Sequence, residues 1–385
     1  MSEKNKKETR YGHMGTTYYF LPTRNLFGED SVKETGSLMQ SLGGKKTLIV
    51  TDAFLAKQGM ARMVQDILKD SGVESVVFGG VEPNPKDVNV EAGLKVFKEN
   101  GCDSIISLGG GSSHDCAKGI GIVASNGGNI RDYEGVDKSQ KPMCPMVAIN
   151  TTAGTASEIT RFCIITDTSR HVKMAIVDWR VTPQIAINDP KLMVGMPPSL
   201  TAATGMDALT HAIEAYVSTA NCNYTDPLAI HAIELIQANL VKSYNGDMDA
   251  RDTMHDAQCL AGQSFSNALL GIVHSMAHKT GAAFVDQGGH IIHGAANAMY
   301  LPKVIAFNAK DPTAKKRYGV IADYMHLGGA NDDEKVALLI KYLRGMNDEL
   351  NIPHGINKYG ADGMPAETGF VHGTYHNRFP HFCTS

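Results

Sequence analysis

The sequence predicts a two-domain chain, in which an α/β domain with a parallel sheet is followed by an all-helical domain. In the first half, short β-rich apolar runs alternate with amphipathic helical segments, a pattern typical of a doubly wound parallel sheet. The pattern changes near Pro197-Pro198, and from Ser199 onward the periodic segments are helical. A chain of 385 residues is long enough for two cores, and we place the domains at residues 1–194 and 195–385.

The expected elements of the first domain follow from its apolar runs. Strands are expected at 45–52, 74–80, 104–111 and 145–152, and helices at 56–69, 87–99 and 112–125. A β-hairpin is expected at 161–167 and 171–178, with its turn near Thr168-Ser169. In the second domain, helical periodicity covers 199–218, 226–241 and one long stretch around 257–274.

Composition and charge exclude several classes of protein. The chain is 43% apolar and 20% charged, and its formal net charge of −4 gives no reason to expect nucleic acid or an anionic membrane as a partner. No apolar run reaches the roughly 18 residues needed to cross a bilayer, and the polar start MSEKNKKETR lacks the apolar core of a signal peptide. The seven scattered cysteines have no CxxC spacing, so reduced thiols in a cytoplasm are expected.

A cluster of glycines at the end of the third expected strand indicates a nucleotide site. Gly109, Gly110, Gly111 and Ser112 lie directly before an expected helix. Glycines let backbone amides approach a pyrophosphate closely, and the following helix offers its N-terminal dipole and free N–H groups. Any tight turn from strand to helix can use such glycines as well. Because ligands of parallel sheets bind at the carboxyl ends of strands, we expect a Rossmann-like dinucleotide-binding domain.

Other polar residues at strand ends support the same interpretation. Asp52 ends the first strand, where a carboxylate can bind ribose hydroxyls and repel a 2′-phosphate, which favours NAD over NADP. Asp52 can equally serve as a helix N-cap, and the two roles are compatible. The loop 151–158 after the fourth strand is also able to line a nucleotide. Lys173 is either a solvated strand charge or a partner for the cofactor.

The stretch 267–299 holds four of the fifteen histidines within an otherwise apolar segment, and these predict a metal site. His274 and His278 are four residues apart and share one face of a helix, as do Asp207 and His211 upstream. With His293 at a glycine-marked turn, the two pairs can converge on one ion. Imidazole and carboxylate ligands without cysteine suit Fe(II) or Zn(II). The alternative is that these are ordinary core or surface histidines held by hydrogen bonds.

Several motifs in order resemble one family. GGGSSHD-x-AK, TTAGTASE, GMDALTHAIEAY, SNALLG-x-VH-x-MAH and HGAANAMYLP are similar to the iron-containing, or group III, alcohol dehydrogenases over roughly residues 18–369. The resemblance implies a two-domain NAD-dependent enzyme that interconverts a short-chain primary alcohol or diol and its aldehyde. It also implies a bound divalent metal, with Fe(II) favoured over Zn(II), and assembly as a homodimer or larger homo-oligomer. The extended segment 18–28 is a candidate for pairing between subunits.

The resemblance also assigns roles to residues. It implies that the metal ligands are Asp207, His211, His274 and His293, and that His278 moves protons near the nicotinamide. The matching cofactor contacts are Asp52, Asn84, Gly109, Gly110, Gly111, Ser112, Thr151, Thr152, Thr155 and Lys173. Phe265 and Leu270 match side chains beside the substrate, and Phe162 and Ile164 are plausible additions.

The chain departs from the family pattern in three places. The usual GTGSE is GTASE here, which adds a methyl group at Ala156. The segment between His274 and His293 is long and supplies His290 as a rival for the last coordination position; we favour His293, which lies in the family pattern HG-x-x-N. The tail from about residue 372 has no helical period, so either the helical domain lacks its last elements or the fold is intact without them.

Two other functions compete with the dehydrogenase. A dehydroquinate-synthase-like lyase would combine NAD and a metal with a cluster of Lys and Arg for an anionic substrate, whereas the segments around the expected site are mainly apolar. A nucleotide- and metal-binding protein with impaired turnover is the other alternative, suggested by the unusual tail. Binding of NAD and metal without alcohol-dependent formation of NADH would distinguish it.

Overall fold

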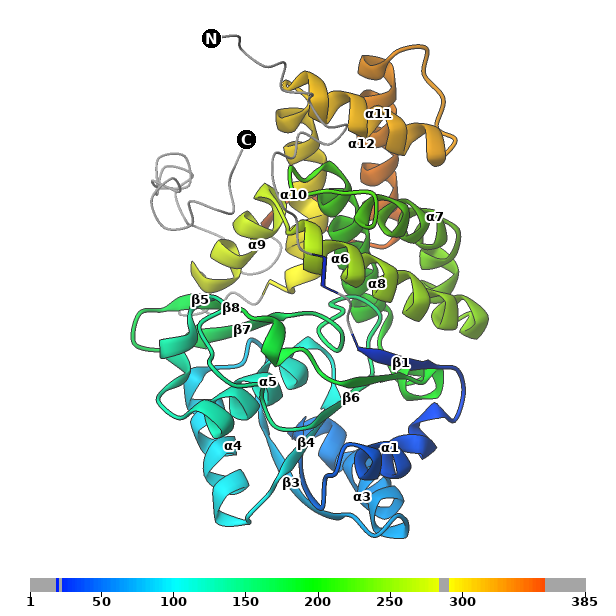
Figure 1. Cartoon of the computed structure of the whole chain (residues 1–385). Coiled ribbons are helices and arrows are strands. Elements are labelled where there is room, and N and C mark those ends of the chain that lie inside the picture. Colours follow the sequence, from blue (N-terminus) through cyan, green and yellow to red (C-terminus); the bar gives the residue numbers. More distant parts are fainter. Residues whose placement is uncertain (1–18, 21–22, 284–290, 357–385) are drawn as a thin grey trace, which may run out of the picture.

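A computed structural model of the chain describes residues 19–20, 23–283 and 291–356. A layer of sheet and helix forms the lower half of Figure 1, and helices form the upper half. The expected fold class, a parallel α/β domain followed by a helical domain, is confirmed. His290 and the tail from residue 372 lie outside the described residues. Within the described residues, no helix is both long enough and apolar enough to cross a membrane.

The main sheet has six parallel strands in the order β1-β9-β6-β4-β2-β3. Four of them are the expected strands: β2 (Lys46–Asp52), β3 (Glu74–Val81), β4 (Ser104–Gly109) and β6 (Met146–Asn150). Strand β9 (Ile185–Asn188) was not expected, and β1 (Arg24–Phe27) lies within the extended segment 18–28, for which pairing between subunits was considered. The two strands pair with each other in parallel, so one edge of β1 is used within the chain, and β1 lies at the border of the sheet.

Helices cover both faces of this sheet because successive side chains of its buried strands point in opposite directions. Leu48 and Val50 of β2 pack with α4 (Asp87–Glu99) and α5 (Gly111–Asn126). Ile49 packs on the other face, with α1 (Thr35–Ser41) and α3 (Met60–Asp70). The single helix expected at 56–69 is wrong: α2 (Ala53–Lys57) ends before Gly59, whose φ of 87° is outside the helical region.

A second, three-stranded sheet has the order β5-β8-β7. The expected hairpin is confirmed: β7 (Phe162–Asp167) and β8 (Val172–Val177) are antiparallel, with Asp167 opposite Val172. Strand β5 (Gly135–Val136) pairs with β8 in parallel. Short 3₁₀ turns complete this half of the molecule: η1 (Ser31–Glu34), η2 (Ile130–Tyr133), η3 (Trp179–Val181) and η4 (Pro190–Met193).

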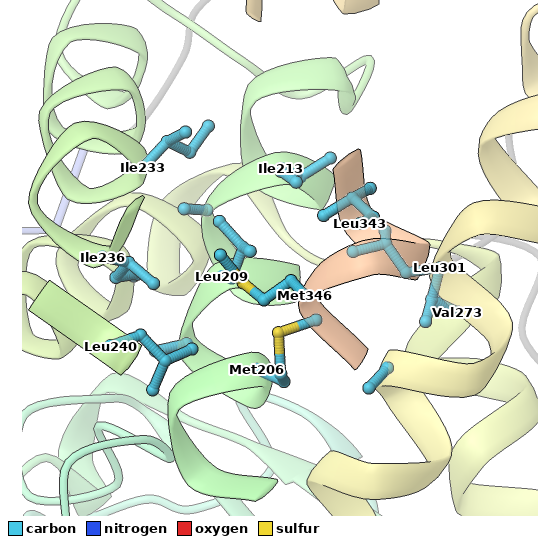
Figure 2. Close-up of a cluster of buried hydrophobic side chains, with 14 of the residues drawn as sticks. Met206, Leu209, Ile213, Ile233, Ile236, Leu240, Val273, Leu301, Leu343 and Met346 are labelled. Carbon is cyan, nitrogen blue, oxygen red and sulfur yellow. The ribbon is translucent and has the colours of Figure 1, made fainter. Parts of the chain in front are cut away.

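The second half is helical from α6 to α12. Its helices are α6 (Pro198–Val217), α7 (Thr225–Tyr244), α8 (Met248–Ala268), α9 (Ile272–Ala283), α10 (His293–Asn308), α11 (Pro312–Tyr324) and α12 (Asp332–Glu349). Their common core joins apolar side chains of α6, α7, α9, α10 and α12, among them Leu209, Ile236 and Leu343 (Figure 2).

The long helix expected around 257–274 is wrong, because the chain breaks between α8 and α9. Leu269 follows α8 with a φ of 66°, a conformation that few residues other than glycine adopt. The carbonyl of Ala268 accepts a hydrogen bond from the Ser218 hydroxyl, which fixes this turn against the end of α6. After this break, His274 of α9 lies against Asp207 and Glu214 of α6.

Candidate active site

Three imidazoles converge on one carboxylate. Asp207 Oδ1 lies 3.9 Å from His211 Nε2, 3.5 Å from His274 Nε2 and 3.7 Å from His293 Nε2. Asp207 and His211 are one turn apart on α6, His274 lies on α9, and His293 is the first residue of α10. Helical spacing brings Asp207 and His211 to one face of α6, and the packing of α6, α9 and α10 brings His274 and His293 to the same place.

The separations suit a small divalent ion. Ligand atoms about 2.1 Å from a metal in tetrahedral geometry lie about 3.4 Å from each other. One ligand atom each from Asp207, His211 and His274 lies within 4.8 Å of the others, and all three residues are buried. The donor set of one carboxylate and imidazoles, without sulfur, is compatible with Fe(II) or Zn(II). The residues therefore fit such an ion.

Protonation states also favour a cation at this place. Burial lowers the pKa of His211 to about 4 and that of His293 to about 3, so both rings are neutral at pH 7 and offer lone pairs. Burial opposes the charge on Asp207 too, yet the surrounding histidines hold the pKa of that carboxyl well below its usual range. Burial likewise opposes charge on His274, but hydrogen bonds to Asp207 and Glu214 raise its pKa to about 9. Metal binding would displace that proton.

A glycine allows α10 to approach α6 closely. A Cβ atom on Gly294 would overlap the carbonyl oxygen of Ala203 and lie 3.0 Å from Cβ of Asp207. Gly294 follows His293 directly, so the same close contact brings that imidazole to Asp207. This gives a steric reason for the glycine of the HG motif.

Two residues that the sequence interpretation did not single out surround the cluster. Glu214 Oε2 lies 2.6 Å from His274 Nδ1, on the ring nitrogen that faces away from Asp207. The Asn297 amide donates to Asp207 Oδ1 at 2.6 Å and lies 3.1 Å from His274 Nε2. Spacing offered a signal for both, because Glu214 is seven residues after Asp207 and Asn297 is four after His293, each on the same helix face.

His278 lies beside this cluster. Its ring stacks on that of His293 with centroids 4.8 Å apart, and meets His274 edge-on at 6.2 Å. Burial lowers the pKa of His278 well below its ordinary value, and repulsion from the neighbouring His293 and Lys173 lowers it further. The ring is therefore neutral at pH 7, with a lone pair beside the proposed metal position, and it is a weaker base than a free imidazole.

The expected nucleotide loops meet at the carboxyl ends of the adjacent strands β4 and β6. A Cβ on Gly110 would lie 2.9 Å from Cγ2 of Thr152, and one on Gly111 would lie 3.0 Å from Cγ2 of Thr155. The Thr151 N–H donates to the Gly109 carbonyl at 3.0 Å. The two loops thus pack on each other, and α5 begins at Gly111 with the free N–H groups of Gly111, Ser112 and the next residue facing away from the helix.

The remaining cofactor candidates come from the ends of β2 and β3 and from β8 of the second sheet. Asp52 Oδ1 accepts the Leu55 N–H at 2.8 Å, so its N-cap role is confirmed. A Cβ on Gly109 would lie 3.3 Å from Leu55 Cδ1, so α2 and the glycine loop are neighbours. Lys173 donates to Asn84 Oδ1 at 2.7 Å, joining β8 to the loop after β3, and burial lowers the pKa of Lys173 to about 8.

Three of the four substrate candidates lie together. The rings of Phe162 and Phe265 are 5.7 Å apart, Phe265 stacks on His211 at 4.2 Å, and Leu270 packs on the same apolar cluster. Ile164 is outside this cluster, and its N–H donates to Asp115 Oδ2 at 3.0 Å. The cluster combines Ala156 and Ile159 from the sheet half with Ala215 and Ala268 from the helical half, so it bridges the two.

The structure gives the GTASE departure a larger consequence than one added methyl group. Ala156 is fully buried and has a φ of 51°, where a Cβ is sterically unfavourable. A Cβ on Gly262 of α8 would overlap the Ala156 methyl group. The space between the loop and α8 therefore holds one methyl group, that of Ala156, and residue 262 has no side chain there.

Profiles of two related families match almost the whole chain. The one described as "Iron-containing alcohol dehydrogenase" matches residues 22–190, and "Fe-containing alcohol dehydrogenase family, C-terminal" matches residues 201–369. The chain belongs to the iron-containing alcohol dehydrogenase family. This iron-type dehydrogenase is thus an oxidoreductase, and its membership favours that function over the lyase.

Individual relatives agree with this assignment. The enzyme is 50% identical to alcohol dehydrogenase 4 of Schizosaccharomyces pombe over 327 residues, 84% of this chain and 76% of that protein. It is 44% identical to the NAD-dependent methanol dehydrogenase of Bacillus methanolicus over 349 residues, 90% of each protein. The crystal structure of a 1,3-propanediol oxidoreductase is similar with a TM-score of 0.85 and 43% identity, covering 90% of each chain.

Proposed function

We propose that this enzyme interconverts a short-chain primary alcohol or diol and its aldehyde, with NAD and a divalent metal as cofactors. The observation that carries the proposal is the convergence of three Nε2 atoms on Asp207 Oδ1 at 3.5–3.9 Å. The proposed ligands are Asp207, His211, His274 and His293, and Fe(II) is favoured over Zn(II) by the family to which the chain belongs. These four residues all lie in the described part of the chain, and the proposed ligand set does not include His290.

Each cofactor would supply chemistry that the side chains lack. A bound divalent metal acts as a Lewis acid toward an alcohol oxygen, and bound NAD accepts a hydride. The protein positions both: the packed loops of Gly109–Ser112 and Thr151–Thr155 lie at the N-terminus of α5, where a pyrophosphate binds well. Asp52, at the end of β2, favours NAD by repelling a 2′-phosphate. Asn84 and Lys173 would complete the cofactor site.

His278 is the proposed proton acceptor. Its ring is neutral, stacks on His293 and is partly exposed, so a ring nitrogen is able to take the hydroxyl proton and pass it to solvent. The Phe162, Phe265 and Leu270 side chains would exclude water and bind the alkyl part of the alcohol. Ile164, outside that cluster, is the least supported of the four substrate candidates.

Several broader properties belong to the same proposal. We place the domain border at 194/195, between η4 and α6, with the helical half providing metal and substrate residues. We infer a homodimer or larger homo-oligomer in the cytoplasm, with the outer edge of β1 as a candidate subunit contact. No nucleic acid or membrane partner is part of the proposal.

The experiment that tests this function is an assay of NADH formation at 340 nm with ethanol, butanol and propanediols. The protein is stripped of metal, reloaded anaerobically with Fe(II) or Zn(II), and compared with His274→Ala; NADP⁺ replaces NAD⁺ in a parallel series. Metal-restored, NAD-linked activity that is lost in His274→Ala is expected. Tight binding of NAD and metal with no turnover would instead favour the binding-only alternative.

A further inference from the structure

We propose that Glu214 is a positioning residue of the metal centre, which aims the Nε2 lone pair of His274 at the metal and fixes the start of α9. The inference rests on the proposed function, because it concerns the same metal site. Glu214 lies on α6, three residues after His211 and seven after Asp207, and so projects from the same side of the helix.

The contacts of Glu214 join two elements at one point. Oε2 lies 2.6 Å from His274 Nδ1, and Oε1 accepts the Val273 N–H at 2.8 Å. The His274 N–H also points to Oε2, at 3.4 Å. The side chains of Glu214 and His274 are 6% and 4% exposed. One buried carboxylate therefore binds both the backbone and the ring of a proposed ligand.

A buried carboxylate is costly unless donors surround it. Here the donors are the first N–H groups of α9, whose dipole favours an anion, and the His274 ring. Within the described part of the chain, no Lys or Arg forms an ion pair with Glu214. The chain before α9 passes very close to the carboxylate: a Cβ on Gly271 would lie 2.9 Å from Oε1. This glycine leaves space for the carboxylate at the helix start.

The chemical consequence concerns the two nitrogens of His274. A carboxylate group accepts hydrogen bonds, so the proton that stays on the His274 ring after metal binding displaces the other lies on Nδ1, and Nε2 presents its lone pair. Nε2 faces Asp207 Oδ1 at 3.5 Å, where the metal is proposed. A carboxylate behind a metal-binding histidine orients the ring and increases its basicity.

His293 lacks such support in the described residues, since its Nδ1 is buried without a hydrogen-bond partner. Its side chain is also more exposed than that of His274, 27% against 4%. Hydrogen bonds to Glu214 thus orient the His274 ring before metal binds, whereas the position of His293 depends on the placement of α10. The effect of Glu214 on metal affinity should accordingly exceed what capping α9 alone would produce.

The test compares Glu214→Gln with wild type and with Asp247→Asn, using the full chain stripped of metal. Asp247 caps α8 by accepting the Ala250 N–H at 3.0 Å, so its variant makes the same chemical change at a helix start outside the metal site. Anaerobic titration with Co(II), followed by visible absorption, measures metal affinity and reports coordination geometry. Thermal unfolding of the metal-free proteins and NAD binding are measured alongside.

We expect Glu214→Gln to weaken Co(II) binding by about 10–100-fold and to change the Co(II) spectrum, with NAD binding unchanged. Asp247→Asn should lower the melting temperature and leave Co(II) affinity unchanged. Equal Co(II) affinity and an unaltered spectrum in Glu214→Gln would overturn the inference and leave only a helix cap. If Glu214→Gln does not fold, Glu214→Asp decides, since its shortened carboxylate should weaken Co(II) binding as well. Failure of wild type to bind Co(II) would refute the metal site of the proposed function itself.

Discussion

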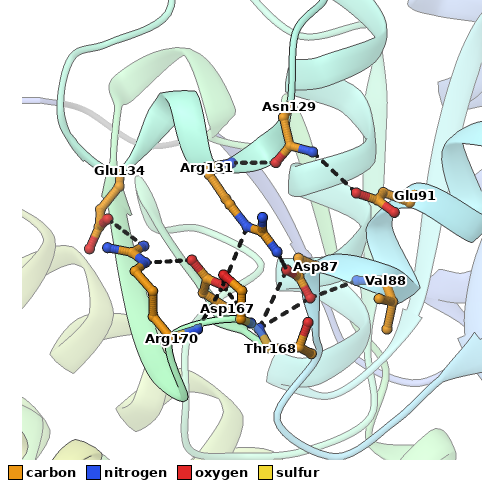
Figure 3. Close-up of polar contacts among 10 residues, drawn as sticks. Asp87, Val88, Glu91, Asn129, Arg131, Glu134, Asp167, Thr168 and Arg170 are labelled. Carbon is orange, nitrogen blue, oxygen red and sulfur yellow. Dashed lines mark hydrogen bonds and ion pairs between the residues drawn. The ribbon is translucent and has the colours of Figure 1, made fainter.

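Two sites among the buried aspartates of the described residues differ in the side chains that face them. Asp207 is 3% exposed and faces three imidazoles. Asp87 and Asp167 are 1% and 0% exposed and face guanidinium groups (Figure 3). Arg131 bonds to both of these aspartates, and Arg170 joins Asp167 to Glu134 at the turn of the β7–β8 hairpin.

The aspartates of the hairpin form ion pairs with arginines, whereas Asp207 faces imidazoles and is suited to bind a metal ion. Guanidinium groups are permanently charged, so the aspartates of the hairpin network are neutralised by the protein itself. The rings of His211 and His293 are neutral, so they do not compensate the charge of Asp207, and their lone pairs are available to a cation. The first arrangement ties the hairpin bearing Lys173 to the start of α4, whereas the second is suited to a divalent cation. Burial of a carboxylate alone would not distinguish the two functions.

The largest expected effect follows from Asp207→Asn. The amide keeps the shape of the side chain but removes the charge that the three imidazoles surround. We expect affinity for Zn(II) or Co(II) to fall by more than about 1,000-fold, beyond the cost of losing an outer contact. The metal-free protein should also lose about 3 kcal/mol of stability, because the protonated His274 ring is then buried beside an amide instead of the Asp207 carboxylate. Competitive metal titration and urea unfolding measure the two quantities.

Gly294→Ala tests the packing that assembles the proposed metal site. Its Cβ would overlap the Ala203 carbonyl, so α10 must move away from α6 and take His293 with it. We expect a loss of about 3 kcal/mol in stability, together with weaker metal binding. Gly345→Ala on α12 is the matched control, because no atom lies within 4 Å of the new Cβ; it should stabilise the protein by about 0.5–1 kcal/mol. Equal behaviour of the two variants would contradict the steric explanation.

Asp167→Asn is expected to act on stability and not on metal binding. It places a buried amide beside two guanidinium groups, at a cost of about 2–3 kcal/mol, since both arginines remain partly solvated. Burial opposes ionisation of Asp167, but hydrogen bonds from Ser169 and Arg170 outweigh it and lower its pKa below the unfolded value of about 3.9. The stabilisation is therefore present above about pH 4 and is lost as pH falls below it. Unfolding from pH 7 to pH 2 should show wild type and variant converging in acid.

Arg170→Lys should have the smallest effect. Arg170 is 48% exposed and contacts both Asp167 and Glu134. Replacing its guanidinium with an ammonium group should therefore lower the free energy of unfolding by less than about 1 kcal/mol. The difference should shrink further in 1 M salt, where surface charges are screened. Arg62→Lys, which alters an exposed pair on α3, is the control and should change stability by even less. A loss above 2 kcal/mol would mean that the network is more rigid than its exposure indicates.

The sequence by itself determined the features that depend on neighbours along the chain. Helix period and apolar runs predicted α4 with its bounds 87–99, the β7–β8 hairpin and four strands of the sheet. Helical spacing also predicted that Asp207 and His211 share a face of α6. These follow from local geometry, because side chains three or four residues apart meet on any helix.

Only the tertiary structure decided the features that depend on distant partners. The four-residue strands β1 and β9 carry little periodic signal and exist because they pair across about 160 residues. The break at Leu269 is invisible in helical periodicity, since its φ of 66° is fixed by contacts such as that of Ser218 with Ala268. The proposed role of Glu214 could be inferred only once the position of α9 was known, because 59 residues separate Glu214 from the Val273 N–H whose hydrogen bond it accepts. Sequence spacing selects which side chains share a face, and packing alone selects which faces meet.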